Sequence, residues 1–155
     1  MNSLLSFDDA YIERIDKETE EVLAKETTEF LKQTIGYFKK HKNEFLFVES
    51  KSFDKVRTDS VSFEVDNAFG TYDVMLGLKF PKKYASKIKK QLKKQLETEE
   101  APFDLMFNGD DGLWDLNFTF NYVSGFKEDM TIGEAYGLIF SFLHKLVGAV
   151  AENTE

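Results

Sequence analysis

One stretch of alternating residues, Trp114 to Val123, constrains the fold of this 155-residue chain more than any other. Large apolar side chains occupy every second position, and polar side chains lie between them. The apolar set is Trp114, Leu116, Phe118, Phe120 and Tyr122, and the polar set is Asp115, Asn117, Thr119 and Asn121. Such alternation indicates a strand with one buried face and one face in water. Other segments of the chain must therefore cover an aromatic face.

Shorter segments of the chain alternate in the same way. We predict strands at residues 45–49, 60–66, 72–80 and 103–108. Gly70 lies between the second and third of these, and the dipeptide Asn108-Gly109, a strong hairpin signal, follows the fourth. Strands joined by short turns run antiparallel. With Trp114–Val123 as the fifth strand, the sequence predicts a five-stranded antiparallel sheet.

The segment before these strands has a helical pattern. Residues 7–40 contain no proline and one glycine, Gly36, and their apolar positions recur at helical spacing. The apolar stripe of the first half is rotated by about 100° from that of the second half. A bend near Lys25 to Thr28, or two separate helices, would account for this rotation. We therefore predict an N-terminal helical region over residues 7–40.

Two amphipathic helices are predicted further along the chain. Residues 82–96 follow Pro81 and place apolar side chains on one arc and lysines on the opposite side. Residues 131–151 begin with a capping box formed by Thr131 and Glu134. The apolar arc of this last helix spans roughly 200°, about twice what packing on one sheet requires. We expect the surplus to bury against the N-terminal helical region or a second subunit, and we expect a homodimer.

These elements make a single domain over residues 1–155, with the helical region at 7–40 and an α+β core at 45–151. The predicted order is α-β-β-β-α-β-β-α, with helices on one face of the five-stranded antiparallel sheet. This order resembles the type III secretion chaperone-like fold of bacteria over about Phe7 to Ala151, without a shared motif. The resemblance implies a dimeric, non-catalytic binding protein or chaperone, and it assigns no functional residue.

The charge and composition of the chain narrow the classes of partner. The net charge is −8 and the isoelectric point about 4.9, so phosphate backbones repel the protein and we expect no nucleic-acid partner. Basic partners are attracted. The chain lacks cysteine, which excludes disulfides, thiolate catalysis and cysteine-based zinc sites. No secretory leader pattern and no apolar run of about 18 residues occurs, so we expect a cytoplasmic protein without a membrane span.

No group of residues in the sequence predicts catalysis. His41 and His144 lie far apart, and each is expected to be structural. Asp110, Asp111 and Asp115 lack the ligand spacing of a calcium loop and are expected at a solvated hairpin tip. Neither a glycine-rich phosphate loop nor a serine nucleophile elbow occurs. We therefore expect no enzymatic activity, no cofactor and no metal, since a carboxylate enzyme would need acidic residues that converge in a cleft.

Two surfaces are candidates for binding. The first comprises the polar side of the aromatic strand and, on the surplus side of the last helix, two further residues; these are Asp115, Asn117, Thr119, Asn121, Leu138 and Phe142. The second is the basic side of the middle helix, which is either a binding face or a solvated one, and consists of Lys83, Lys87, Lys90 and Lys94. The leading hypothesis is a protein-binding adaptor, chaperone-like or immunity-like. The alternative is a carrier of a small apolar ligand in an aromatic cavity beneath the fifth strand.

Overall fold

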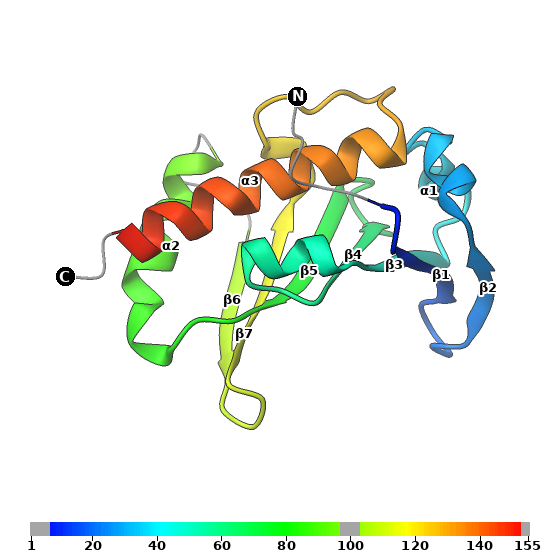
Figure 1. The fold of residues 1–155 in the computed structure, drawn as a ribbon. Helices are drawn as coiled ribbons and strands as arrows, with labels where there is room; N and C mark the ends of the chain where they lie inside the picture. The colour runs from blue at the N-terminus through cyan, green and yellow to red at the C-terminus, as the bar shows by residue number, and fades with distance from the viewer. Residues whose placement is uncertain (1–6, 97–102, 153–155) are drawn as a thin grey trace.

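A single antiparallel sheet forms the frame of the protein (Figure 1). The structure is a computed structural model that describes residues 7–96 and 103–152. The sheet has seven strands in the order β2-β1-β3-β4-β5-β7-β6. The strands are β1 (Tyr11–Asp16), β2 (Val22–Glu26), β3 (Glu44–Glu49), β4 (Ser60–Val65), β5 (Tyr72–Leu78), β6 (Phe103–Asn108) and β7 (Leu113–Thr119). The α+β class and the antiparallel sheet are confirmed, but the prediction of five strands is wrong.

Helices and short helical turns cover one face of this sheet. The longest helix, α3 (Ile132–Glu152), lies across the strands and contacts α2 (Ala85–Gln95) (Figure 1). The capping box of α3 forms as predicted, since Thr131 N–H donates to Glu134 Oε1 at 2.9 Å and Glu134 N–H donates to Thr131 Oγ1 at 3.0 Å. The other helical segments are α1 (Tyr37–Lys40) and the 3-10 turns η1 (Thr28–Lys32), η2 (Lys51–Val56), η3 (Lys82–Tyr84) and η4 (Phe120–Tyr122).

The predicted helical region over residues 7–40 is wrong. That segment forms the hairpin β1–β2, followed by η1 and α1. β1 lies between β2 and β3, so strands pair with both of its edges. Ile12 is the buried residue of β1, and it is the cross-strand partner of Val48. The apolar spacing of this segment fits a helix, but tertiary pairing with β3 overrides that local pattern. The observed chain thus begins with strands, and the element order on which the resemblance rests is not the observed one.

The turns β4–β5 and β6–β7 share one design. Asp66 Oδ1 and Asn108 Oδ1, at the start of each turn, accept backbone N–H groups two residues further on, at 2.8 and 3.0 Å. The fifth residue is a glycine in the left-handed region, Gly70 at φ 72° and Gly112 at φ 71°. Its N–H closes the turn onto the carbonyl oxygen of the first residue, at 2.9 and 2.8 Å. Glycine reaches this conformation without a Cβ clash, which makes both turns recognisable in the sequence.

The turn β1–β2 has the same design without the glycine. Asp16 Oδ1 accepts from the backbone N–H groups of Glu18 and Thr19, at 2.9 and 3.0 Å. Glu20 takes the fifth position at φ 63°, and its N–H donates to Asp16 O at 2.8 Å. A residue other than glycine is uncommon in this conformation. Because this turn has no glycine, the sequence lacks the turn signal that marks the other two hairpins.

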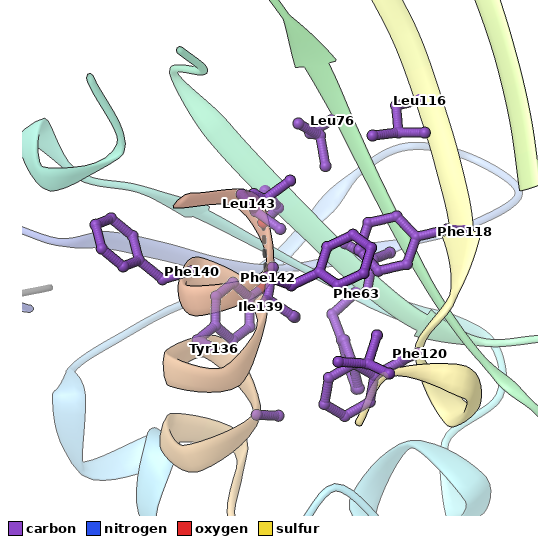
Figure 2. Packing of buried hydrophobic residues seen from close by; sticks show 14 of the residues in the cluster. Phe63, Leu76, Leu116, Phe118, Phe120, Tyr136, Ile139, Phe140, Phe142 and Leu143 are labelled. Carbon is purple, nitrogen blue, oxygen red and sulfur yellow. Dashed lines mark hydrogen bonds between the residues drawn. The ribbon is translucent and has the colours of Figure 1, made fainter. Parts of the chain in front are cut away.

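The core lies between the sheet and α3 (Figure 2). Phe63 of β4 contacts the rings of Tyr72, Phe120 and Tyr136, whose centroids are 5.5, 5.5 and 6.1 Å away. Tyr136 of α3 is fully buried, and its hydroxyl donates to Val61 O at 3.0 Å. Burial raises the pKa of the Tyr136 hydroxyl well above its ordinary value, so the hydroxyl remains a donor at neutral pH.

The aromatic strand is shorter than predicted. β7 ends at Thr119, and η4 begins at Phe120, so the last part of the predicted strand is wrong. Phe118 of β7 stacks on Phe142 of α3, with centroids 4.7 Å apart (Figure 2). Phe120 remains fully buried although it has left the strand. Side chains of α3 therefore fill the space beneath the aromatic face.

The wide apolar arc of α3 is largely buried within the chain itself. α3 contacts α2, η1 and η2. Phe53 and Val56 of η2 are buried. Gly133 of α3 lies so close to η1 that a Cβ atom would be 3.4 Å from Leu31 O. The chain's own turns thus cover part of the wide apolar arc, while Leu138 and Val147 remain partly exposed.

A charged network closes the core near β1 and β3. Arg14 Nε is 2.7 Å from Glu26 Oε2, and Arg14 Nη1 is 3.1 Å from Glu44 Oε2. The Tyr37 hydroxyl donates to Glu44 Oε1 at 3.0 Å. Glu44 is 6% exposed, so its charge depends on these partners. His41 stacks on Tyr37 with ring centroids 4.0 Å apart, a structural contact of the kind expected for this histidine.

Candidate protein-binding surface

The second face of the sheet is open. The register of the strand pairs places alternate side chains of six strands on this face, opposite the core. Apart from Thr119, all of them are partly or fully exposed. We define the open face as Tyr11, Glu13, Ile15, Phe45, Phe47, Glu49, Ser60, Ser62, Glu64, Asp73, Met75, Gly77, Asp104, Met106, Asn108, Leu113, Asp115, Asn117 and Thr119.

Six of the seven strands contribute only acidic charges to this side of the sheet. The charged residues of the open face are Glu13, Glu49, Glu64, Asp73, Asp104 and Asp115, and none of the residues in the definition is basic. Lys25 of the edge strand β2 is the cross-strand partner of Glu13, and its Nζ lies 4.8 Å from the centre of the Tyr11 ring. A surface of several carboxylates attracts cationic groups over a distance of about a Debye length.

A groove of about 620 Å³ lies at one end of the open face. Its acidic lining residues are Glu64, Asp66, Asp73 and Asp104. Phe69 and Tyr122 also line it, and their exposed fractions are 83% and 44%. Phe69 comes from the turn β4–β5 and Tyr122 from η4, so segments distant in sequence build this groove. The groove combines carboxylates with accessible aromatic rings.

Two carboxylates of the groove face each other directly. Glu64 of β4 and Asp73 of β5 are cross-strand partners. Burial, followed by the nearby charges of Asp66 and Glu64, raises the pKa of Asp73 to about 6. Burial also raises the pKa of Glu64, and Lys17 opposes that shift. The carboxylates of the groove therefore disfavour one another's ionised form.

Lys17 neutralises only one side of the groove. Its Nζ is 3.9 Å from Glu64 Oε2 and donates to Val65 O at 2.6 Å and to Asn67 Oδ1 at 3.1 Å. These bonds hold the ammonium group beside β4 and the turn β4–β5. Among the described residues, none forms an ion pair with Asp73 or with Asp104. The β5 and β6 side of the groove thus retains carboxylates that form no ion pair with the described residues.

The polar side of the aromatic strand lies where the alternation places it. Asp115, Asn117 and Thr119 belong to the open face, and Asn117 and Thr119 line the groove. Asn121 is different because the strand has ended: its Oδ1 accepts from Tyr72 N–H at 2.8 Å. Asn121 therefore fixes the junction between β5 and η4.

Leu138 and Phe142 lie on the other side of the sheet from the polar residues of β7. Phe142 is 6% exposed and stacks on Phe118, so it is part of the core. Leu138 is half-buried, and its side chain lies 3.2 Å from where a Cβ of Gly125 would be. The structure therefore does not combine these helix residues with Asp115 and Asn117 into one surface.

The basic face lies on α2 and η3, in the helical layer. Lys90 and Lys94 are exposed, as is Lys83, whereas Lys87 is partly buried with its Nζ 5.4 Å from the ring centre of Tyr84. The helical layer and the open face are on opposite sides of the sheet (Figure 1). The lysines of α2 and η3 and the carboxylates of the open face thus lie on opposite sides of the sheet.

Sequence reasoning did not identify the groove residues Glu64, Asp73 and Phe69. Alternation in each strand indicates which side of the sheet a residue faces, but only the register brings Glu64 opposite Asp73. Phe69 lies in the turn, where no periodicity applies. The run Asp66-Asn67-Ala68-Phe69-Gly70 carries one usable signal, a large aromatic side chain at the tip of a tight polar turn.

By length and composition, α3 is the one helix of the described residues that could cross a membrane, over Ile132–Ala151. Half of the tested window is buried inside the protein, as expected for a helix that packs on a sheet. Within the described residues, no group of three or more His, Cys, Asp and Glu side chains could hold a metal ion. No protein-family model matches the chain, and neither the curated proteins nor the solved structures contain a significant match to it.

Proposed function

We propose that this protein is a non-enzymatic protein-binding domain, an adaptor or chaperone-like protein, that engages a basic partner through its open face. The single observation that carries the proposal is an uncovered sheet face on which six strands carry only acidic charged residues, with Lys25 of the edge strand β2 as the basic residue beside them. A sheet face that carries partly exposed Phe45, Phe47 and Met75 offers apolar contact area. Carboxylates around such area favour a partner of opposite charge and disfavour other partners.

The same charge argues against two other partner classes. Phosphate groups of nucleic acids and of anionic lipids are repelled by the open face. The lysines of α2 could meet such groups, but they lack exposed aromatic residues interleaved among them. We therefore propose a cytoplasmic protein whose α3 is a core helix and whose partner is another protein.

The aromatic face under β7 gives no support to the carrier alternative, because Phe118 stacks directly on Phe142.

A photo-crosslinking residue tests this proposal in the cells that produce the protein. Placed at the position of Ser62 on the open face, it should yield a discrete adduct with one protein, and the crosslinked segment should be basic. The same residue at the position of Lys90 on α2 is the matched control and should yield none. The adduct at position 62 should weaken when Asp104→Asn and Asp115→Asn are introduced. Adducts at position 90 alone, or none at either position, would contradict the proposal.

A further inference from the structure

We infer that the groove at the end of the open face is an anchor site for one lysine or arginine side chain of the partner protein. This inference rests on the proposed function and adds the chemical group that the site recognises. It draws on the placement of the carboxylates, on their missing counter-charge and on the aromatic rings beside them.

The carboxylates converge from three strands and a turn. Glu64 of β4 faces Asp73 of β5, and Asp66 begins the turn between these strands. Asp104 of β6 is the cross-strand partner of Asn117, which also lines the groove. A cationic head group placed among these residues would find several carboxylate acceptors, which give charge-assisted hydrogen bonds.

The counter-charge within the chain is incomplete. Lys17 is held by Val65 O and Asn67 Oδ1 beside Glu64. Asp73 and Asp104 form no ion pair with any described residue. A cation that pairs with Asp73 or Asp104 would then come from outside the described residues. A protein partner can supply it as a single side chain.

The aromatic rings favour an organic cation over a metal ion. Phe69 and Tyr122 are exposed and line the groove, and an ammonium or guanidinium group is attracted to the face of such rings. Met75 lines the groove as well and offers apolar contact to the aliphatic stem of a lysine or arginine. Hard divalent cations take oxygen ligands, which the rings and the thioether do not supply. The described residues also contain no group of three or more side chains able to hold a metal.

The titration of Asp73 adds a pH dependence to this binding. The charged groups that act on Asp73 are Asp66 of the turn, Glu64 of β4 and Lys17 of the turn β1–β2, and Asp104 of β6 lines the same groove. Burial and the acidic neighbours raise the pKa of Asp73 to about 6. A cation binds the ionised carboxylate, so binding should strengthen as pH rises from 5 to 7. The Asp73→Asn variant should lose most of this dependence.

Short capped peptides test the inference on the purified protein by amide chemical-shift titration. The probe is a glycine-serine pentapeptide with one central arginine, and a second probe carries lysine there. The control peptide carries citrulline, which has the shape of arginine without its charge. The arginine and lysine peptides should shift the amide signals of Asp73, Asn117 and Phe69, and the citrulline peptide should bind at least tenfold more weakly.

Charge-matched variants separate the groove from the general acidity of the protein. Asp73→Asn with Asp104→Asn should weaken arginine-peptide binding at least tenfold. Asp110→Asn with Asp111→Asn removes the same charge at the exposed turn β6–β7 and should change it less than twofold. Equal weakening in both variants, or equal binding of the citrulline peptide, would overturn the inference. So would groove shifts with spermidine in the absence of a response to the peptides, because the site would then serve a free polyamine.

The outcomes separate this inference from the proposed function. A crosslinked partner at position 62 without a peptide response contradicts the anchor site and leaves the protein-binding function standing. A peptide response in the groove without an open-face adduct contradicts the function and leaves a cation site. The citrulline control and the charge-matched variants decide the first question, and the crosslink decides the second.

Discussion

Glu64 and Asp73 face each other on neighbouring strands, so the open face carries a direct cross-strand pair of like charges. Like charges in this position destabilise a sheet by up to about 1 kcal/mol. This pair therefore lowers the stability of the isolated fold. Proteins retain such destabilising pairs at sites that bind a ligand or partner.

Replacing Asp73 with asparagine should stabilise the protein at neutral pH. Burial raises the pKa of Asp73 to about 6, so ionisation of this group opposes folding. Its contribution to stability is fully present below the unfolded pKa of about 4 and is lost as pH rises through about 6. Asp73→Asn should therefore gain about 1 kcal/mol at pH 7, allowing for solvent screening, and little at pH 3.5. Urea unfolding at both pH values measures this, and a loss of stability at pH 7 would contradict it.

The turn β1–β2 should accept a stabilising glycine. Glu20 has a φ of 63°, the conformation that Gly70 and Gly112 take in the two related turns. Glu20→Gly should raise the free energy of unfolding by about 0.5–1 kcal/mol, because the Cβ strain disappears. Glu18→Gly in the same turn lacks the positive φ and should be neutral or destabilising. Thermal unfolding of the Glu20→Gly and Glu18→Gly variants measures the change in stability of each. Equal changes would show that Glu20 is not strained.

Breaking the charged network at Arg14 should destabilise the fold strongly. Arg14→Met leaves the buried Glu44 without its cation, which should cost about 3 kcal/mol. Lys32→Met breaks the exposed pair with Glu29 and should cost less than about 0.5 kcal/mol. Adding Glu44→Leu to Arg14→Met should recover part of the loss, because the stranded carboxylate is removed. Denaturant unfolding measures the free energy of unfolding of these variants. An unchanged value for Arg14→Met would contradict the role of the charged network.

Phe142 should affect stability and not binding. Its ring stacks on Phe118 in the core, so Phe142→Ala should destabilise by about 3–4 kcal/mol through lost burial and a cavity. Lys145→Ala, at an exposed position of the same helix, should change stability by less than about 0.5 kcal/mol. At a temperature where the Phe142 variant remains folded, its open face should still bind. Full stability of Phe142→Ala would contradict the packing of α3 on β7.

The strands and helices after residue 44 could largely be predicted because their patterns act locally. Alternation marks β7 and β5, and Gly70 and Gly112 mark two turns through the backbone conformation that they allow. The first hairpin lacks such a signal, since Glu20 replaces the glycine. Pairing with β3 makes that segment extended, and such pairing depends on residues distant in sequence.

The candidate site was predictable only in part. Alternation correctly places Asp115 and Asn117 on the solvent side of β7. The groove depends on the strand order, which places β7 between β5 and β6 although α2 separates β5 from both along the chain. Phe142 was predicted on a binding surface but lies in the core. Its position on the helix suggests a surplus apolar surface, yet its ring is stacked on Phe118 of β7.

The position of α3 in the chain has a consequence for synthesis on the ribosome. All seven strands precede α3, so they can emerge and pair before the helix that packs on them exists. Until then, Phe63 and Phe118 have no partner from α3, and the growing polypeptide presents an aromatic surface to the cell. Chains at this stage are prone to associate with one another. General folding factors at the ribosome exit should therefore matter more for the newborn protein than for a purified chain that refolds with all its segments present.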